Sequence, residues 1–232
     1  MARVLMIVSA ADSLTMRDGT EHPTGFWAEE LVVAHQVLRE AGHTVELATP
    51  GGRRPTVDQA SLDPGTTGGQ EEADGFRAYL EGIDAELSAP LVLSEVDPGD
   101  YDALVLPGGH GPMADLVHDA SLGRILSSAD RAGRLIAPFC HGPAGLLSAQ
   151  DDGTFLFAGR RMTAFTNEEE LGGGTGENTP WFLETVLREK GAVVETGPAW
   201  SSHVVRDAHL VTGQNPQSSR AVAEVVLEAL AE

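Results

Sequence analysis

The first apolar run of the chain is Arg3-Val4-Leu5-Met6-Ile7-Val8-Ser9. Short continuous runs of this kind are typical of strands that are buried on both faces of a parallel sheet. A helical pattern follows from Thr24 to Ala41, with Thr24 as the expected N-cap and Gly42 as the glycine that ends the helix. Val45-Glu46-Leu47-Ala48 then predicts a second strand. Strand, helix and strand in this order predict a βαβ unit and therefore a parallel α/β sheet.

The same alternation continues in the second half of the chain. The expected elements are strands at 101–106, 134–137, 161–164 and 193–194, helices that follow the first two of these strands, a helix over 180–190, a hairpin over 203–212 and a helix over 218–230. We predict a single α/β domain over residues 1–232, with a doubly wound, mostly parallel sheet sandwiched by helices. Residues 50–98 are rich in Gly, Pro, Asp and Thr, and we interpret them as a small cap insertion that buries little apolar area.

The charge balance limits the partners that this chain can bind. It has 15 Lys and Arg against 35 Asp and Glu, which gives a formal net charge of −20. Such a surface repels phosphate backbones and anionic lipid head groups, so we expect neither nucleic acid nor a membrane as a partner. No apolar run approaches the roughly 20 residues that span a bilayer. The expected location is the cytoplasm.

The only cysteine, Cys140, lies in the segment Phe139-Cys140-His141-Gly142, directly after a predicted buried strand. One cysteine excludes an internal disulfide and a metal site made of cysteines alone. A lone cysteine is often a small buried hydrophobe. At a strand–turn–helix elbow, however, the helix N-terminus favours thiolate, and the neighbouring histidine also favours a nucleophile. We therefore predict an acidic, reactive thiol, with the amide of His141 free to donate to an oxyanion.

A second turn of interest, Pro107-Gly108-Gly109-His110-Gly111, follows another predicted strand. Its N–H groups are candidates for a second oxyanion donor, although a glycine turn at a strand end is also common without function. Ligands of open parallel sheets bind beyond the carboxyl ends of the strands. We therefore expect this turn to lie near Cys140.

Several other motifs carry no recognisable chemistry. The segment from Gly172 to Gly176 lacks the spacing of a dinucleotide fingerprint or a P-loop, and we expect a mobile loop there. No Gly-x-Ser-x-Gly elbow occurs. Five histidines show no metal-ligand spacing: His22, His35, His43, His118 and His209. We expect no metal and no cofactor.

Five motifs together resemble those of the ThiJ/PfpI superfamily. They are Thr24-Gly25-Phe26-Trp27-Ala28-Glu29-Glu30, the glycine turn at 107–111, Ala137-Pro138-Phe139-Cys140-His141-Gly142-Pro143-Ala144, Ala164-Phe165-Thr166-Asn167-Glu168-Glu169-Glu170 and Val211-Thr212-Gly213-Gln214-Asn215-Pro216. The resemblance covers essentially the whole chain, and it is strongest to the heat-shock-protein-31-like branch, the glutathione-independent glyoxalases III. It implies the flavodoxin-like fold of class I glutamine amidotransferases and a homodimer.

The resemblance also implies the roles of particular residues. In that branch the elbow cysteine, which matches Cys140, is the nucleophile, and the next residue, His141, is the triad histidine. The triad acid matches Glu170, and a second glutamate beside the sulfur matches Glu30, with Glu29 rotated away by about 100° of helix. A carboxyl group beside a thiolate is reasonable if Glu30 is protonated and donates a hydrogen bond to it. Four further residues are expected to bind the substrate or its oxyanion: Gly109, His110, Phe26 and Trp27.

The implied reaction is that of a lyase of the D-lactate dehydratase type, which converts methylglyoxal or a similar 2-oxoaldehyde to a 2-hydroxy acid. Cys140 would attack the aldehyde carbon, His141 or Glu30 would move the C1 proton to C2, and water would hydrolyse the thioester. Other possibilities remain open. One is a different lyase or hydrolase of the superfamily, such as an isocyanide hydratase or an enzyme of specialised metabolism, with the larger aromatic side chains shaping its pocket or simply filling the core. Another is a stress-response chaperone, a deglycase or a redox sensor.

Overall fold

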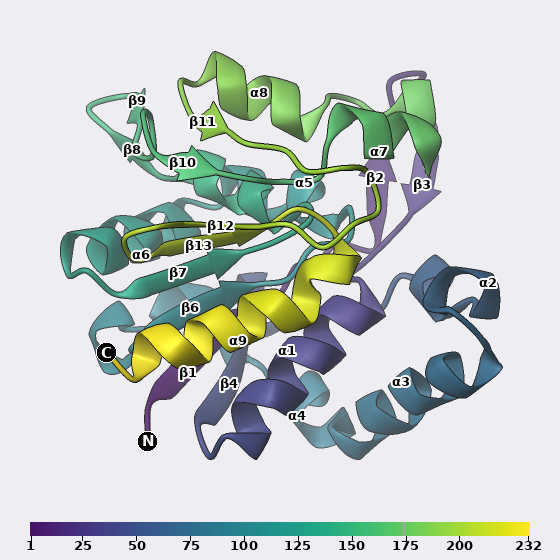
Figure 1. The fold of residues 1–232 in the computed structure, drawn as a ribbon, viewed down its shortest axis with the longest axis horizontal. Helices are drawn as coiled ribbons and strands as arrows, with labels where there is room; N and C mark the ends of the chain where they lie inside the picture. The colour runs from purple at the N-terminus through teal and green to yellow at the C-terminus, as the bar shows by residue number, and fades with distance from the viewer. Residues whose placement is uncertain (174) are drawn as a thin grey trace.

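The computed structural model describes residues 1–173 and 175–232 and is built around a seven-stranded sheet (Figure 1). The strand order is β12-β13-β7-β6-β1-β4-β5. Neighbouring strands pair in parallel, except that β12 and β13 form an antiparallel hairpin. The strands are β1 (Arg3–Ile7), β4 (Thr44–Thr49), β5 (Leu91–Val92), β6 (Ala103–Leu106), β7 (Leu135–Pro138), β12 (Val204–Asp207) and β13 (Leu210–Gly213).

Helices cover both faces of this sheet. In Figure 1, α1 and α9 lie side by side in front of the sheet, and α6 lies behind it. Alternate residues of β1 explain the two layers, because Val4 and Met6 pack with α1 and α9, whereas Leu5 and Ile7 pack with α6. The helices are α1 (Ala28–Glu40), α2 (Pro64–Thr67), α3 (Gln70–Gly82), α4 (Asp84–Ser88), α5 (Gly111–Ala114), α6 (Ala120–Arg131), α7 (Asn167–Gly172), α8 (Leu183–Glu189) and α9 (Ser219–Leu230).

Short elements complete the chain. Three two-stranded sheets pair β2 (Ser13–Thr15) with β3 (Glu21–Pro23), β8 (Gln150–Asp151) with β9 (Thr154–Phe155), and β10 (Arg161–Met162) with β11 (Val193–Val194). The 3-10 helices are η1 (Pro50–Gly52), η2 (Gln59–Leu62), η3 (Leu93–Glu95), η4 (Pro98–Asp100), η5 (Leu116–His118), η6 (Gly142–Ser148), η7 (Gly176–Asn178) and η8 (Pro216–Ser218). The loop that the sequence predicts to be mobile includes Gly174, which lies outside the described residues.

The first helix begins later than the sequence predicts. Its first residue is Ala28, and Trp27, not Thr24, occupies the N-cap position. The reason is a non-local pairing, in which the N–H of Phe26 donates to the carbonyl of Thr56 at 2.9 Å and the N–H of Asp58 donates back to Phe26. This pairing holds residues 24–27 extended. The predicted C-terminal glycine is confirmed, because Gly42 follows the helix with a φ of 84°.

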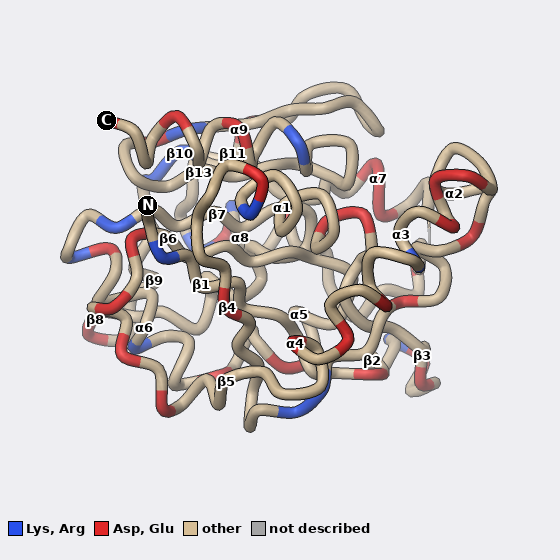
Figure 2. The backbone as a smooth tube through the Cα atoms, turned by 90° about the horizontal axis from the view of Figure 1, so that it is seen from below, with Lys and Arg blue, Asp and Glu red and all other residues tan. Residues whose placement is uncertain are grey.

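Residues 50–98 bury more apolar side chains than their composition suggests. Phe76 of α3 packs against α1, and Leu87 and Leu93 are buried in the two main cores. Strand β5 pairs with β4 and forms one edge of the sheet. The segment is acidic, since Asp and Glu are frequent along α3 and in the turn before α2 (Figure 2).

The strand order reverses beside β1, the first strand, because β4 lies on one side of it and β6 on the other. The loops after β1, β6 and β7 therefore meet at one edge of the sheet, where ligands of such sheets bind. Within residues 1–173 and 175–232, no helix combines the length and the apolar composition that crossing a membrane requires.

Candidate active site

Cys140 lies at a tight elbow directly after β7. Its φ is 56°, in the left-handed region that non-glycine residues rarely adopt. The surrounding chain holds it there, because its N–H donates to the carbonyl of Gly213 at 2.9 Å and its carbonyl accepts from the N–H of Phe165 at 2.9 Å. The turn also requires Gly142, where an added Cβ would lie 2.1 Å from the carbonyl oxygen of Leu106. Such over-determined backbone strain is common at functional sites.

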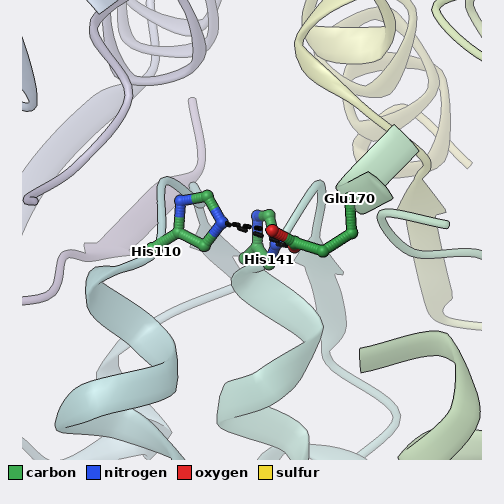
Figure 3. Close-up of side chains that lie close together, drawn as sticks. All are labelled: His110, His141 and Glu170. Atoms are coloured by element: carbon green, nitrogen blue, oxygen red, sulfur yellow. Dashed lines mark hydrogen bonds and ion pairs between the residues drawn. The ribbon is translucent and has the colours of Figure 1, made fainter. Parts of the chain in front are cut away.

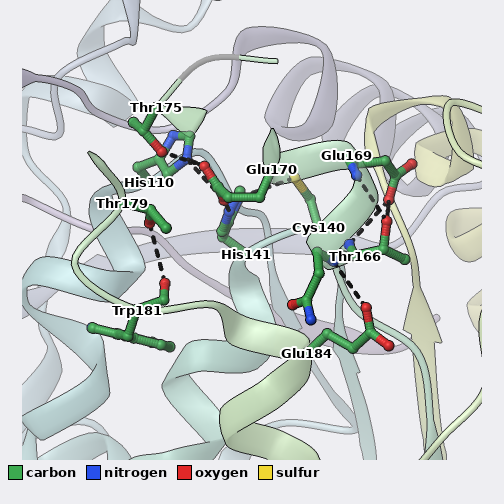
Figure 4. A network of polar contacts seen from close by, with 11 residues as sticks. His110, Cys140, His141, Thr166, Glu169, Glu170, Thr175, Thr179, Trp181 and Glu184 are labelled. Atoms are coloured by element: carbon green, nitrogen blue, oxygen red, sulfur yellow. Dashed lines mark hydrogen bonds and ion pairs between the residues drawn. The ribbon is translucent and has the colours of Figure 1, made fainter. Parts of the chain in front are cut away.

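The structure brings Cys140, His141 and Glu170 into one buried chain of contacts. The sulfur lies 3.5 Å from Nδ1 of His141, and Nε2 of the same ring lies 2.7 Å from Oε2 of Glu170 (Figure 4). All three residues are almost inaccessible to solvent. The geometry is that of a nucleophile, a base and a carboxylate that orients the base.

The three consecutive glutamates of α7 have different environments. Glu169 forms a capping box with Thr166, and its Oε1 accepts from the N–H of Trp200 at 2.8 Å and from Nδ2 of Asn215 at 2.7 Å. Glu168 is exposed. Of these three glutamates only Glu170 reaches His141, and it is the one that the family resemblance implies as the triad acid.

A second imidazole shares the carboxylate of Glu170, a contact that the sequence did not predict. Nε2 of His110 lies 3.0 Å from Oε1 of Glu170, and the ring centroids of His110 and His141 are 4.2 Å apart (Figure 3). The hydroxyl of Thr175 also donates to Oε1 (Figure 4). The family resemblance implies a place for His110 near the substrate, and this residue also lines the cavity above the thiol.

These contacts determine which atoms of Glu170, His110 and His141 carry a proton. Burial alone would raise the pKa of Glu170, but the hydrogen bonds of His110 and His141 outweigh burial and hold that pKa below its usual value. An ionised carboxylate only accepts, so both imidazoles donate from Nε2. Burial, together with the neighbouring His110, lowers the pKa of His141. A neutral His141 with its proton on Nε2 has Nδ1 free to accept the thiol proton.

Glu30 lies behind the sulfur and is completely buried. Its Oε2 accepts from the N–H of Gly108 at 2.6 Å, whereas Oε1 has no hydrogen-bond partner in the described chain. Burial raises the pKa of Glu30 to about 8, although contacts with Cys140 and Gly108 partly oppose this effect. The carboxyl group is therefore protonated over most of the acidic and neutral range.

The electrostatics of Cys140 differ from the acidic thiol that the elbow predicts. Burial raises the pKa of the thiol, and the neighbouring carboxylate of Glu30 raises it further. The N–H groups of Gly109 and His141 point at the sulfur and lower the pKa, but by less. The expectation of a thiolate considered only the helix N-terminus, and desolvation outweighs that effect here.

A cavity of about 320 Å³ opens above the sulfur. Gly109, His110, Cys140 and His141 line it, and so does Trp27. The structure does not place Phe26 there. That side chain is buried in the core between the sheet and α1, because the pairing of its backbone with Thr56 turns it inward.

His110, His141 and Glu170 together offer ligand atoms for a metal ion, although the sequence predicts none. One atom from each residue lies within 4.8 Å of the others. Two imidazoles and a carboxylate suit transition metals. A metal would have to displace both Nε2 protons and the hydrogen bonds that now join these residues.

The parallel sheet and the buried cysteine elbow at its carboxyl edge define the class, an α/β protein of DJ-1-like fold, and confirm the predicted fold. The chain belongs to the DJ-1/PfpI family, whose model matches residues 22–229.

Known relatives are similar over nearly the whole chain. A glyoxalase 3 of Candida albicans is 28% identical, with 99% of this chain and 98% of the relative covered. The crystal structure of glyoxalase III from Candida albicans superposes with a TM-score of 0.84 at 28% identity, covering 98% of this chain and 97% of that one. A protein/nucleic acid deglycase of Pseudomonas aeruginosa is 27% identical, with 99% of this chain and 82% of the relative covered.

Proposed function

We propose that this protein is a glutathione-independent glyoxalase, which adds water to methylglyoxal or a related 2-oxoaldehyde and gives the 2-hydroxy acid. The observation that carries the proposal is the buried chain from Cys140 through His141 to Glu170, with the Glu30 carboxyl group behind the sulfur. The likeness to a relative named glyoxalase 3 supports it. One carbon of the substrate is oxidised and its neighbour is reduced, so the reaction needs no external oxidant or reductant.

In the first step the sulfur of Cys140 bonds to the aldehyde carbon, C1. The thiol proton passes to Nδ1 of His141, 3.5 Å away, and from there to the former carbonyl oxygen. The N–H groups of Gly109 and His141 lie at the sulfur and stabilise the negative charge on that oxygen. Glu170 stabilises the imidazolium between the two proton transfers.

In the second step a proton moves from C1 to C2. C1 is bonded to the sulfur, so its hydrogen lies within reach of Glu30, whose Oε1 has no hydrogen-bond partner among residues 1–173 and 175–232. Ionised Glu30 takes this proton, and the electron pair of the C1–H bond forms a C1=C2 double bond that leaves the negative charge on the C2 oxygen. The hydroxyl proton of the C1 oxygen passes to the C2 oxygen, and Glu30 returns its proton to C2, so that C1 becomes the carbonyl carbon of a thioester. A pKa of about 8 leaves both forms of Glu30 accessible for this shuttle.

In the last step water attacks the thioester carbonyl. Nδ1 of His141 accepts the water proton and gives it to the leaving sulfur, which restores the thiol of Cys140. The products are the 2-hydroxy acid and the free enzyme.

The test is the conversion of methylglyoxal to lactate by the purified protein without glutathione, followed by ¹H NMR. We expect kcat/KM to rise with pH through about 8, as Glu30 becomes ionised. Cys140→Ser, checked for folding by circular dichroism, should form no lactate, and the exposed Glu168→Gln variant should retain full activity. Absence of turnover in the unmodified protein, or normal turnover by Cys140→Ser, contradicts the proposal.

A further inference from the structure

The cavity above Cys140 is larger than methylglyoxal requires. Its volume of about 320 Å³ falls in the range of roughly 300–1,000 Å³ that is usual for sites of drug-sized ligands. Methylglyoxal carries only a methyl group beyond its two carbonyls. A substrate of this size on Cys140 leaves most of the cavity walls without contacts, and such gaps forfeit dispersion energy.

Three aromatic side chains form a wall of this cavity: Trp27, Phe165 and Trp200. The indole of Trp200 packs edge-on against the ring of Phe165, with their centroids 5.6 Å apart. It also rests on Gly173, where an added Cβ would lie 2.7 Å from the indole. These contacts fix a large apolar side chain that remains 45% exposed.

The backbone at Trp200 shows that this position is held by the surrounding structure. Its φ is 59°, in the left-handed region, and its N–H donates to Oε1 of the buried Glu169 at 2.8 Å. An aromatic side chain kept at a cavity mouth by strained backbone is preorganised, so a ligand does not have to order it on binding.

The cavity wall carries two carboxylate side chains. Glu29 and Asp58 line it together with His22, His110 and His141, and no described lining residue is Lys or Arg. Asp58 is hydrogen-bonded to the N–H of Ala60 at 2.9 Å and to the hydroxyl of Thr24 at 3.2 Å. Glu29 has no hydrogen-bond or ion-pair partner among the described residues, and burial together with Glu72 raises its pKa to about 7. An anionic substituent beside Glu29 would therefore meet a carboxylate, with no Lys or Arg among the described lining residues to compensate its charge.

We propose that this cavity selects 2-oxoaldehydes that carry an aromatic, uncharged substituent and disfavours those with an anionic one. The inference rests on the proposed glyoxalase function and names the substrate class of the same site. With C1 bonded to Cys140, the substituent on C2 lies against the wall of Trp27, Phe165 and Trp200. Glu29 then opposes a negative charge on that substituent.

The aromatic wall is tested by the ratio of kcat/KM for phenylglyoxal to kcat/KM for methylglyoxal at pH 8. We expect a ratio of roughly tenfold or more, since stacking contacts of this kind give about one factor of ten. Trp200→Leu should reduce the ratio severalfold. Trp181→Leu, a matched change at a tryptophan that packs in the core outside this cavity, should leave the ratio unchanged. A ratio near one, or an unchanged ratio in Trp200→Leu, overturns the proposal.

The charge preference is tested by 4-carboxyphenylglyoxal against phenylglyoxal. The carboxylate should lower kcat/KM at least roughly tenfold, and Glu29→Gln should recover most of this loss, because it removes the opposing charge. Glu168→Gln, which does not line the cavity, should recover none. Equal use of both aldehydes by the unmodified protein overturns this part.

A binding measurement separates the inference from the proposed function. Acetophenone and 4-acetylbenzoate carry the same aryl ketone groups as the two aldehydes but a methyl group in place of the aldehyde, so they cannot undergo the reaction. Both can be titrated into Cys140→Ser by calorimetry. We expect acetophenone to bind at least roughly tenfold more tightly. If no aldehyde is turned over but acetophenone still binds more tightly than 4-acetylbenzoate, the proposed glyoxalase function is wrong and the proposed preference of the cavity for uncharged aromatic groups stands. If turnover is normal and both ketones bind equally, the cavity assignment fails.

Discussion

Nε2 of His110 lies 3.0 Å from Oε1 of Glu170, so the carboxylate that orients His141 also accepts from a second imidazole. The two histidines come from turns after neighbouring strands, β6 and β7. The shared carboxylate keeps both Nε2 atoms protonated and leaves Nδ1 of His141 facing the sulfur. A single charge thereby fixes the tautomers of two rings.

Glu170→Gln should lower kcat for methylglyoxal by about 10²–10⁴-fold. The amide cannot carry the negative charge that stabilises the imidazolium of His141, and it has only one oxygen for two imidazole donors. Steady-state kinetics measure the loss. Glu168→Gln, an exposed change in the same helix, is the control and should be silent. Full activity in Glu170→Gln would remove this residue from the mechanism.

Glu169→Gln should lower the free energy of unfolding. Its two carboxylate oxygens accept from Thr166, Trp200 and Asn215, and an amide turns its NH₂ group toward some of these donors. Leaving buried donors without an acceptor costs about 1–3 kcal/mol. Urea unfolding should show this decrease. The kcat for methylglyoxal per folded molecule should stay within about twofold of that of the unmodified protein. An unchanged midpoint with lost activity would mean that the triad acid is displaced by one residue.

The elbow of Cys140 is readable from sequence because it depends on neighbours along the chain. Glu170 lies 29 residues from His141, and only the resemblance to the ThiJ/PfpI motifs indicates it. The capping box also has a local signature, since Thr166 and Glu169 stand three residues apart, and this spacing by itself separates Glu169 from Glu170. The contact between His110 and Glu170 joins residues 60 positions apart and has no local signal.

The start of α1 and the pKa of the thiol differ from what the sequence predicts, and the physical reason is the same for both. Local propensity favours a helix from Thr24, but the pairing of Phe26 with Thr56 and Asp58 overrides it. The helix N-terminus favours a thiolate at Cys140, but the burial of this residue and the carboxyl group of Glu30, which comes from another element, have the larger effect. Both errors concern interactions that only the tertiary structure creates.

The rate at which iodoacetamide alkylates Cys140 should increase with pH, with an apparent pKa above the ~8.5 of a free cysteine. Glu30→Gln removes the neighbouring negative charge and should lower that value, with the amide able to donate to the thiolate. The alkylation rate as a function of pH, followed by mass spectrometry, gives both values. A midpoint well below 8.5 in the unmodified protein would show that desolvation does not dominate at this elbow.

Zinc should inhibit the enzyme, because His110, His141 and Glu170 offer ligand atoms within 4.8 Å of one another. Activity should return on addition of EDTA. Calorimetry with Cys140→Ser distinguishes zinc binding at these three residues from zinc binding at the thiol. Zinc should still bind to Cys140→Ser, and its affinity should fall at least roughly tenfold when His110→Asn is added to that variant. Zinc binding that is lost with Cys140 and indifferent to His110 would assign the ion to the sulfur.

Glu30→Gln should stabilise the fold increasingly as the pH rises. The pKa of Glu30 is about 8 in the folded protein and near 4.3 in an unfolded chain, so the folded state holds the proton more tightly. Protonated Glu30 costs the folded state nothing while the pH stays below the unfolded-state pKa of about 4.3. As the pH rises from there to about 8, the free energy of unfolding falls progressively. The loss is on the order of 5 kcal/mol. An amide resembles the protonated acid in shape and does not ionise, so the variant escapes this loss.

Urea unfolding of both proteins from pH 4.5 to 8.5 provides the measurement. The free energies of unfolding should nearly coincide at pH 4.5 and diverge in favour of Glu30→Gln up to about pH 8, beyond which the difference is constant. Glu168→Gln should follow the unmodified protein within about 0.5 kcal/mol throughout, since its side chain is exposed. Parallel curves for Glu30→Gln and the unmodified protein would mean that the folded state does not raise the pKa of Glu30, and the shuttle between C1 and C2 would then need a different carrier.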